Sequence, residues 1–169
     1  MMITKLPPRP LFAALGLSAL ALLITAYYLQ HGPEHQQPCP LCILQRYAYI
    51  GIALTGLVAA IHGPSRVGTL IYAGLGTLLS VAGMGLAVWQ LTKGSTMLSC
   101  TSDPIGIWVN SLPMTNWWPE YFFATGGCAD KYPPILGLSV PVWSLICFAG
   151  FSTVNEILLV NYLRQQAKT

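Results

Sequence analysis

The sequence predicts an all-α integral membrane protein: a bundle of four transmembrane helices with a long extracytoplasmic loop that contains a short interfacial amphipathic helix. Hydrophobic residues make up 54% of the 169 residues and charged residues only 8%, whereas a soluble domain carries about 25% charged residues. Four apolar runs are also long enough to cross a membrane. The composition excludes a disordered chain, and a net charge of +3 from scattered residues excludes a nucleic-acid-binding face.

Each predicted span is a run of about 20 predominantly apolar residues, the length that crosses the hydrocarbon core. The runs cover residues 11–29, 43–61, 67–91 and 142–160. The first run is longer than the apolar region of a signal peptide and ends without a small-residue cleavage site. We therefore expect it to be a retained span, in a single membrane domain over residues 1–169.

The basic residues predict the orientation of the bundle, because they concentrate in cytoplasmic segments. With four spans, both tails lie on one side, together with the connection between the second and third spans. That side holds five basic residues and the other side two: Lys5, Arg9, Arg66, Arg164 and Lys168 against Lys93 and Lys131. Both termini are therefore predicted to be cytoplasmic, and the loops 31–42 and 92–141 extracytoplasmic.

The cysteines are the residues that carry chemistry. The predicted topology places Cys39, Cys42, Cys100 and Cys128 on the extracytoplasmic side, and Cys147 inside the fourth span. Four cysteines in an oxidising compartment are typical of two disulfides. The first two have the C-x-x-C spacing of redox dithiols. Cys147 is interpreted as a packing residue.

Cys42 and Arg46 form the predicted reactive site. Cys42 immediately precedes the second apolar run, and the start of a helix favours a thiolate through its free N–H groups and partial positive charge. Arg46 follows four residues later, on the same helical face. A guanidinium there would stabilise a thiolate, or a negative oxygen on a ligand beside it.

Simpler interpretations of these residues remain open. The C-x-x-C pair is compatible with a structural disulfide, although its tiny loop offers only about 2 kcal/mol of loop-closure entropy. Arg46 is compatible with an anchor that snorkels to lipid headgroups. His31 and His35, with the cysteine pair, have spacings that resemble a zinc site. Pro33 and Pro38 interrupt that pattern, however, and a metal would compete with disulfide formation, so we predict no metal site.

The remaining features are expected to be structural. Gly76 and Gly83 have small residues four positions later, which lets transmembrane helices approach closely. Glu156, near the end of the fourth span, is predicted to pair with Arg66 or Arg164.

The long loop contains an aromatic segment between its two cysteines. It runs from Trp108 to Phe123 and includes Trp117-Trp118-Pro119-Glu120-Tyr121-Phe122. Tryptophan and tyrosine concentrate at the level of the lipid headgroups, so we expect this segment to lie on the bilayer surface. A patch that binds a partner is the alternative.

Three segments of the chain resemble one family. They are Cys39-Pro-Leu-Cys-Ile-Leu-Gln-Arg46, Phe123-Ala-Thr-Gly-Gly-Cys128, and Leu136-Gly-Leu-Ser-Val-Pro141-Val-Trp143. With the length and the four spans, they are similar to the disulfide bond formation protein B family, the bacterial inner-membrane thiol:quinone oxidoreductases. The resemblance covers nearly the whole chain.

The resemblance implies a function and a role for each site residue. Members of this family reoxidise a periplasmic thioredoxin-fold disulfide oxidase (DsbA-like) and pass the electrons to membrane quinone. Cys100 and Cys128 match the pair that exchanges with the oxidase, with Cys100 in the mixed disulfide. Cys39 and Cys42 match the pair next to the quinone, and Cys42 and Arg46 match the quinone site.

The resemblance implies ubiquinone or menaquinone as the cofactor. No flavin is expected, because the chain carries no nucleotide-binding motif, and no metal is expected either. The expected location is the bacterial inner membrane, multi-pass, with the active cysteines on the periplasmic side. One departure is that some relatives carry a histidine in the third span, whereas residues 67–91 contain none.

Two alternatives differ in class. A four-helix reductase similar to the vitamin K epoxide reductases would run in the opposite direction, but in that family the loop pair precedes the C-x-x-C. A tetraspan scaffold with two structural disulfides would not be an enzyme, and its disulfides would resist exchange with small dithiols.

Overall fold

A computed structural model describes residues 7–33, 35–93, 104–128 and 133–166. The chain forms long helices and short ones in this order: α1 (Pro8–His31), α2 (Pro40–His62), α3 (Arg66–Lys93), α4 (Pro104–Asn110), α5 (Pro113–Trp117), α6 (Pro119–Phe122) and α7 (Val140–Gln166). The four long helices, α1, α2, α3 and α7, are long and apolar enough to cross a membrane. The predicted fold class is confirmed.

The ends of the long helices follow from local chemistry. Each long helix extends beyond its apolar run, because the flanking residues favour the start or the end of a helix. Pro8 and Pro40 occupy the first turns of α1 and α2, where a missing N–H costs nothing. Gly63 ends α2 in the left-handed conformation, at φ 58°. His31 and His62, which lie just beyond the predicted spans, are the last residues of their helices.

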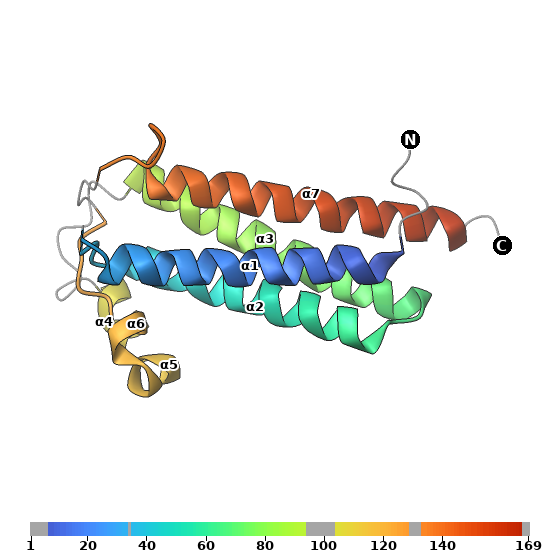
Figure 1. The fold of residues 1–169 in the computed structure, drawn as a ribbon, viewed down its shortest axis with the longest axis horizontal. Helices are drawn as coiled ribbons and strands as arrows, with labels where there is room; N and C mark the ends of the chain where they lie inside the picture. The colour runs from blue at the N-terminus through green and yellow to red at the C-terminus, as the bar shows by residue number, and fades with distance from the viewer. Residues whose placement is uncertain (1–6, 34, 94–103, 129–132, 167–169) are drawn as a thin grey trace.

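The long helices pack as neighbouring pairs (Figure 1). α1 lies along α2, and α3 lies along α7, with α2 also against α3. The expected role of the small residues of the third span is confirmed. A Cβ on Gly76 would meet the Asn155 side chain at 2.7 Å, and one on Gly83 would meet the Phe148 ring at 2.3 Å. These glycines let α3 approach α7 closely.

The aromatic segment forms α4, α5 and α6 in place of one amphipathic helix. Pro113 and Pro119 each begin a new helix, because proline is tolerated in a first turn and not in a helix interior. Trp117 is 89% exposed and Trp108 is 56% exposed. Other residues of the segment are buried in one cluster with Ile43, near the start of α2: Val109, Tyr121, Phe122 and Ala124.

All of the short helices lie at one end of the bundle (Figure 1). The α1–α2 connection lies at that end too, while the start of α1, the end of α7 and the α2–α3 connection lie at the other end. The cysteine-bearing loops are thus brought together by the up-and-down course of the four long helices.

Glu156 differs from the prediction. Its carboxylate accepts a hydrogen bond of 2.8 Å from Ser152, one turn earlier in α7. Within the described residues this hydroxyl takes the place of the expected arginine, because a partner four residues away on one helix is available without any tertiary contact.

Candidate functional site

The C-x-x-C pair forms the N-terminus of α2. Cys39 is the N-cap residue, and its sulfur accepts a hydrogen bond from the backbone N–H of Cys42 at 3.3 Å. Pro40 occupies the first helical position and fixes the turn. The two sulfur atoms lie 3.0 Å apart. The helix start therefore holds both sulfurs together, with one of them in place of the usual capping oxygen.

Cys128 reaches this pair because its loop docks onto the segment before α2. The backbone N–H groups of Thr125 and Gly126 both donate to the carbonyl of Pro38, at 3.1 Å each. A Cβ on Gly126 would lie 2.3 Å from the carbonyl oxygen of Gln37, so glycine is required for this approach. The loop is thereby fastened next to Cys39.

The thiols of Cys128 and Cys39 are in hydrogen-bond contact. This bond, the bond to the Cys42 thiol and burial together raise the pKa of the Cys39 thiol above its usual range. Three of the four predicted site cysteines are thus brought together at one end of α2. Cys100 lies outside the described residues.

Arg46 lies one turn inside α2 from Cys42, as the sequence predicts, and is only 7% exposed. Its guanidinium donates to the side-chain oxygen of Gln30 at 2.8 Å and to the carbonyl of Tyr121. It also lies 4.2 Å from the centre of the Tyr121 ring, a cation–π contact. Arg46 interacts electrostatically with Cys42 as well. The Arg46 guanidinium is therefore directed at groups of the protein.

Gln30 links that arginine to the long loop. Its side-chain oxygen accepts from Arg46, while its side-chain N–H donates to the carbonyl of Glu120. The end of α1, the start of α2 and α6 therefore meet at one hydrogen-bonded junction. Sequence analysis did not identify Gln30 and did not connect Tyr121 with Arg46, because these contacts join segments that lie far apart in the chain.

Two glutamines complete the site. The side-chain N–H of Gln45 donates to the Gln90 oxygen at 2.8 Å. The Gln90 N–H group then donates to the sulfurs of Cys42 at 3.2 Å and Cys39 at 3.4 Å. Sequence analysis missed both residues. A glutamine near the end of an apolar run resembles an ordinary interfacial residue, and only the packing of α3 against α2 places Gln90 on the sulfurs.

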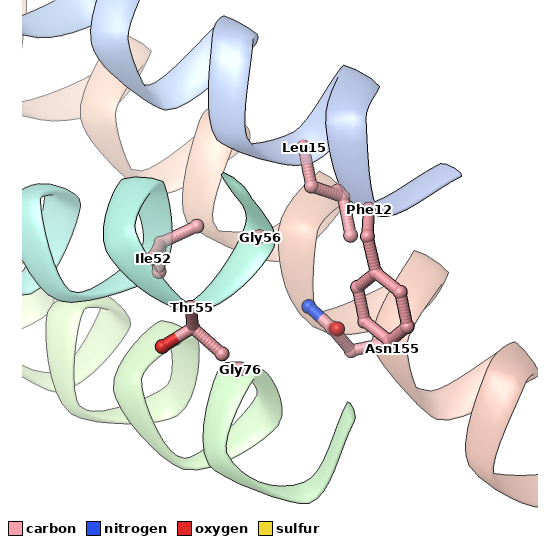
Figure 2. A pocket seen from close by; sticks show the side chains of 7 residues that line it. All are labelled: Phe12, Leu15, Ile52, Thr55, Gly56, Gly76 and Asn155. Atoms are coloured by element: carbon pink, nitrogen blue, oxygen red, sulfur yellow. The ribbon is translucent and has the colours of Figure 1, made fainter. Parts of the chain in front are cut away.

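A small pocket lies elsewhere in the bundle (Figure 2). Its lining comes from α1, α2, α3 and α7: Phe12, Leu15, Ile52, Thr55, Gly56, Gly76 and Asn155. Thr55 follows Cys42 by three to four turns of α2, roughly 20 Å along the axis. This pocket is therefore separate from the cysteines, and the candidate site is the cluster at the N-terminus of α2.

The donors of this cluster suit a quinone. A quinone carries two carbonyl oxygens that become negative on reduction. The guanidinium of Arg46 and the carboxamide of Gln90 are donors of the kind that binds such oxygens, and both act on the Cys42 sulfur.

Comparisons with known proteins identify a family. The family model for disulfide bond formation protein DsbB matches residues 8–158. A disulfide bond formation protein B from Ralstonia nicotianae is 42% identical over 139 residues, which cover 82% of this chain and 85% of that protein. One from Herminiimonas arsenicoxydans is 43% identical over 141 residues, or 83% and 87% of the two chains. One from Nitrosomonas europaea is 39% identical over 153 residues, or 89% and 92%.

Proposed function

The chain belongs to the disulfide bond formation protein B family, and we propose that it is a membrane thiol:quinone oxidoreductase that reoxidises a periplasmic, DsbA-like disulfide oxidase of the thioredoxin fold. The electrons would pass through the pair Cys100–Cys128 and then Cys39–Cys42 to ubiquinone or menaquinone. The protein would lie in the bacterial inner membrane with these cysteines on the periplasmic side.

One observation carries this proposal. The sulfur of Cys128, from the long loop, is in contact with Cys39, whose sulfur lies 3.0 Å from that of Cys42. Thiol–disulfide exchange requires one sulfur to reach another directly. A scaffold with two independent structural disulfides would not need this contact, whereas an electron relay between two pairs does.

The first half of the reaction is exchange with the partner. A thiolate of the reduced oxidase attacks the Cys100 sulfur, which breaks the Cys100–Cys128 bond and leaves Cys128 as a thiolate. The second partner thiol then displaces Cys100, so that the partner leaves as a disulfide and the loop pair is reduced by two electrons. Cys100 takes the mixed disulfide by family resemblance.

The second half moves these electrons to the C-x-x-C pair. The Cys128 thiolate attacks the adjacent Cys39 sulfur, and Cys42 leaves with the bonding electron pair. Cys100 then attacks Cys128, which restores the loop disulfide and releases Cys39. The chemistry that a membrane quinone supplies is the acceptance of two electrons and two protons, which restores the Cys39–Cys42 disulfide. Arg46 and the start of α2 stabilise negative charge on Cys42.

The decisive experiment follows quinone absorbance under anaerobic conditions. Purified protein is mixed with quinone and a reduced thioredoxin-fold oxidase, and we expect quinone reduction only when all three are present. Cys42→Ser should abolish it. Cys147→Ala is the matched control, because Cys147 packs in α7 away from the cluster. Absence of quinone reduction by the unmodified protein would refute the proposal.

A second experiment tests the division of labour between the pairs. Cys128→Ser removes the thiol that resolves the mixed disulfide, so the oxidase should accumulate as an adduct on Cys100. Peptide mapping of that adduct identifies the attachment site. An adduct that runs through Cys39 or Cys42 would exchange the roles of the two pairs.

A further inference from the structure

Two buried glutamines lie between α2 and α3 at the level of the C-x-x-C pair. Gln45 is 5% exposed and Gln90 is 9% exposed. Burying a carboxamide without hydrogen bonds is costly, so each needs partners in the protein. Gln45 donates to Gln90, and Gln90 donates to both sulfurs. The sulfurs are thus the acceptors that satisfy the Gln90 N–H group.

This arrangement fixes which end of the Gln90 carboxamide faces the cysteines. The Gln90 oxygen is occupied by the Gln45 N–H at 2.8 Å, which leaves its NH₂ group to the sulfurs. That group has two hydrogens, and it lies 3.2 Å from Cys42 and 3.4 Å from Cys39. A donor in this position favours a negatively charged sulfur over a neutral one.

The other polar side chain nearby is directed differently. The hydrogen bonds of Arg46 run to Gln30 and Tyr121, so this arginine acts on Cys42 through its field. Within the described part of the chain, Gln90 is the side-chain N–H donor that contacts both sulfurs directly.

We propose that Gln90 is a catalytic residue of the internal exchange step. Its carboxamide N–H stabilises the Cys42 thiolate that leaves when Cys128 attacks Cys39. Gln45 is the residue that positions this carboxamide. The step is balanced: the Cys128–Cys39 bond forms, the Cys39–Cys42 bond breaks, and the electron pair stays on Cys42. The role in the reaction rests on the proposed function, but the effect on the Cys42 sulfur does not.

The test measures the Cys42 thiolate without quinone or partner. In the full chain with the other four cysteines replaced by serine or alanine, ultraviolet thiolate absorbance at neutral pH gives the ratio of thiolate to thiol. Gln90→Met keeps the size of the side chain and removes its donor. We expect the ratio to fall about tenfold, since hydrogen bonds to charged groups are among the stronger ones. Thr92→Val, on the exposed side of α3, is the matched control and should leave the ratio unchanged.

Two further variants test the same carboxamide and the residue that positions it. Gln90→Glu keeps the shape but replaces the donor by an acceptor, so it should lower the ratio at least as much as Gln90→Met, and it decides the question if Gln90→Met does not fold. Gln45→Met should lower the ratio about threefold, because the Gln90 carboxamide becomes free to turn. A ratio within twofold of the Thr92→Val control in the folded Gln90 variants would overturn the role of Gln90, and the same result in Gln45→Met would overturn its positioning role.

Kinetics separate this inference from the proposed function. In the protein with all its cysteines, Gln90→Met should slow quinone reduction about tenfold and leave partner exchange at Cys100–Cys128 unchanged. An equal loss of both steps would contradict a role at Cys42. If the unmodified protein reduces no quinone, the proposed function fails, whereas the thiolate ratio still decides whether Gln90 acts on the sulfur.

Discussion

The guanidinium of Arg46 has a structural role and an electrostatic role at the same place. Its hydrogen bonds to Gln30 and Tyr121 fasten α1 and α6 to the start of α2, while its charge acts on Cys42 one turn away. A charge buried to 7% exposure is weakly screened. The same contacts that hold the loop therefore fix the field at the reactive sulfur.

Arg46→Gln should separate the two halves of the reaction. Removal of one preorganised charged donor typically lowers a rate by about a hundredfold or more, so quinone reduction should fall by that order. Partner exchange at Cys100–Cys128 should survive, because it precedes any charge on Cys42. Arg46→Lys should retain part of the activity, since the charge remains and the planar fork is lost. Steady-state quinone reduction and a single-turnover exchange assay measure the two steps, and unchanged quinone kinetics in Arg46→Gln would exclude it from the quinone site.

The Cys39 thiol should be the slowest of the site thiols to react in the reduced protein. Its raised pKa keeps it protonated at neutral pH, and only the thiolate is nucleophilic. Alkylation of Cys39 should therefore accelerate only well into the alkaline range. Cys128→Ala removes one hydrogen bond to this sulfur, so the midpoint of its alkylation profile should move to lower pH.

Mass spectrometry of alkylated peptides gives the profile for each cysteine. Cys147→Ala is the control, since Cys147 lies in α7 outside the cluster. An identical midpoint in Cys128→Ala and Cys147→Ala would mean that Cys128 does not act on Cys39 in the reduced protein.

The proximity of two site residues could be predicted from the sequence where they lie within about one turn of the same helix. Cys42 and Arg46 are four residues apart on one helix, so their shared face follows from helical geometry alone. Gln90 lies on a different helix from Cys42, and Gln30 and Tyr121 come from segments far from Arg46. Their contacts depend on how α1, α3 and α6 dock against α2, which no local pattern encodes.

At the scale of elements, the junction between α3 and α7 depends on a missing side chain. A Cβ on Gly83 would lie 2.3–2.6 Å from three atoms of the Phe148 ring. That ring is fully buried and stacks on Tyr49 with ring centres 4.2 Å apart. The ring therefore has no free space into which it can move, and one added methyl group must separate the helices.

Gly83→Ala should destabilise the bundle by about 1–3 kcal/mol, the usual cost of overpacking. The gain in helix propensity from glycine to alanine, about 1 kcal/mol, offsets only part of it. Gly85→Ala is the matched control two residues away, because a Cβ there meets nothing within 4 Å. Reversible unfolding in mixed micelles gives both free energies, and equal stability of the two variants would contradict the packing account.

The loop shows where element prediction reaches its limit. Its aromatic content predicts a place at the membrane surface, and Pro113 and Pro119 explain why it breaks into short helices. The way in which the end of the loop docks onto the bundle does not follow from composition. The Asn110 side chain both donates to the Ala124 carbonyl and accepts from the Ala124 N–H. This pair of hydrogen bonds fixes the course of the backbone that leads to Cys128.

For the whole molecule, four spans followed from the lengths of the apolar runs, and an even number of spans requires both tails at one end. In the structure the start of α1 and the end of α7 lie at one end of the bundle (Figure 1), and the short helices and the N-terminus of α2 with its C-x-x-C pair lie at the other end. Which end faces the periplasm is a separate question, which rests on the excess of basic residues at the end with the tails.

Two single-cysteine proteins decide that orientation. In a chain whose native cysteines are replaced, Ser111→Cys places a thiol on the exposed turn between α4 and α5, and Ser65→Cys places one on the exposed turn between α2 and α3. The two turns lie at opposite ends of the bundle. A thiol reagent that does not cross membranes should label Ser111→Cys on intact cells and Ser65→Cys only after permeabilisation. The reverse pattern would place the sulfur cluster on the cytoplasmic side, where reducing conditions disfavour stable disulfides, and a periplasmic oxidase could not reach it.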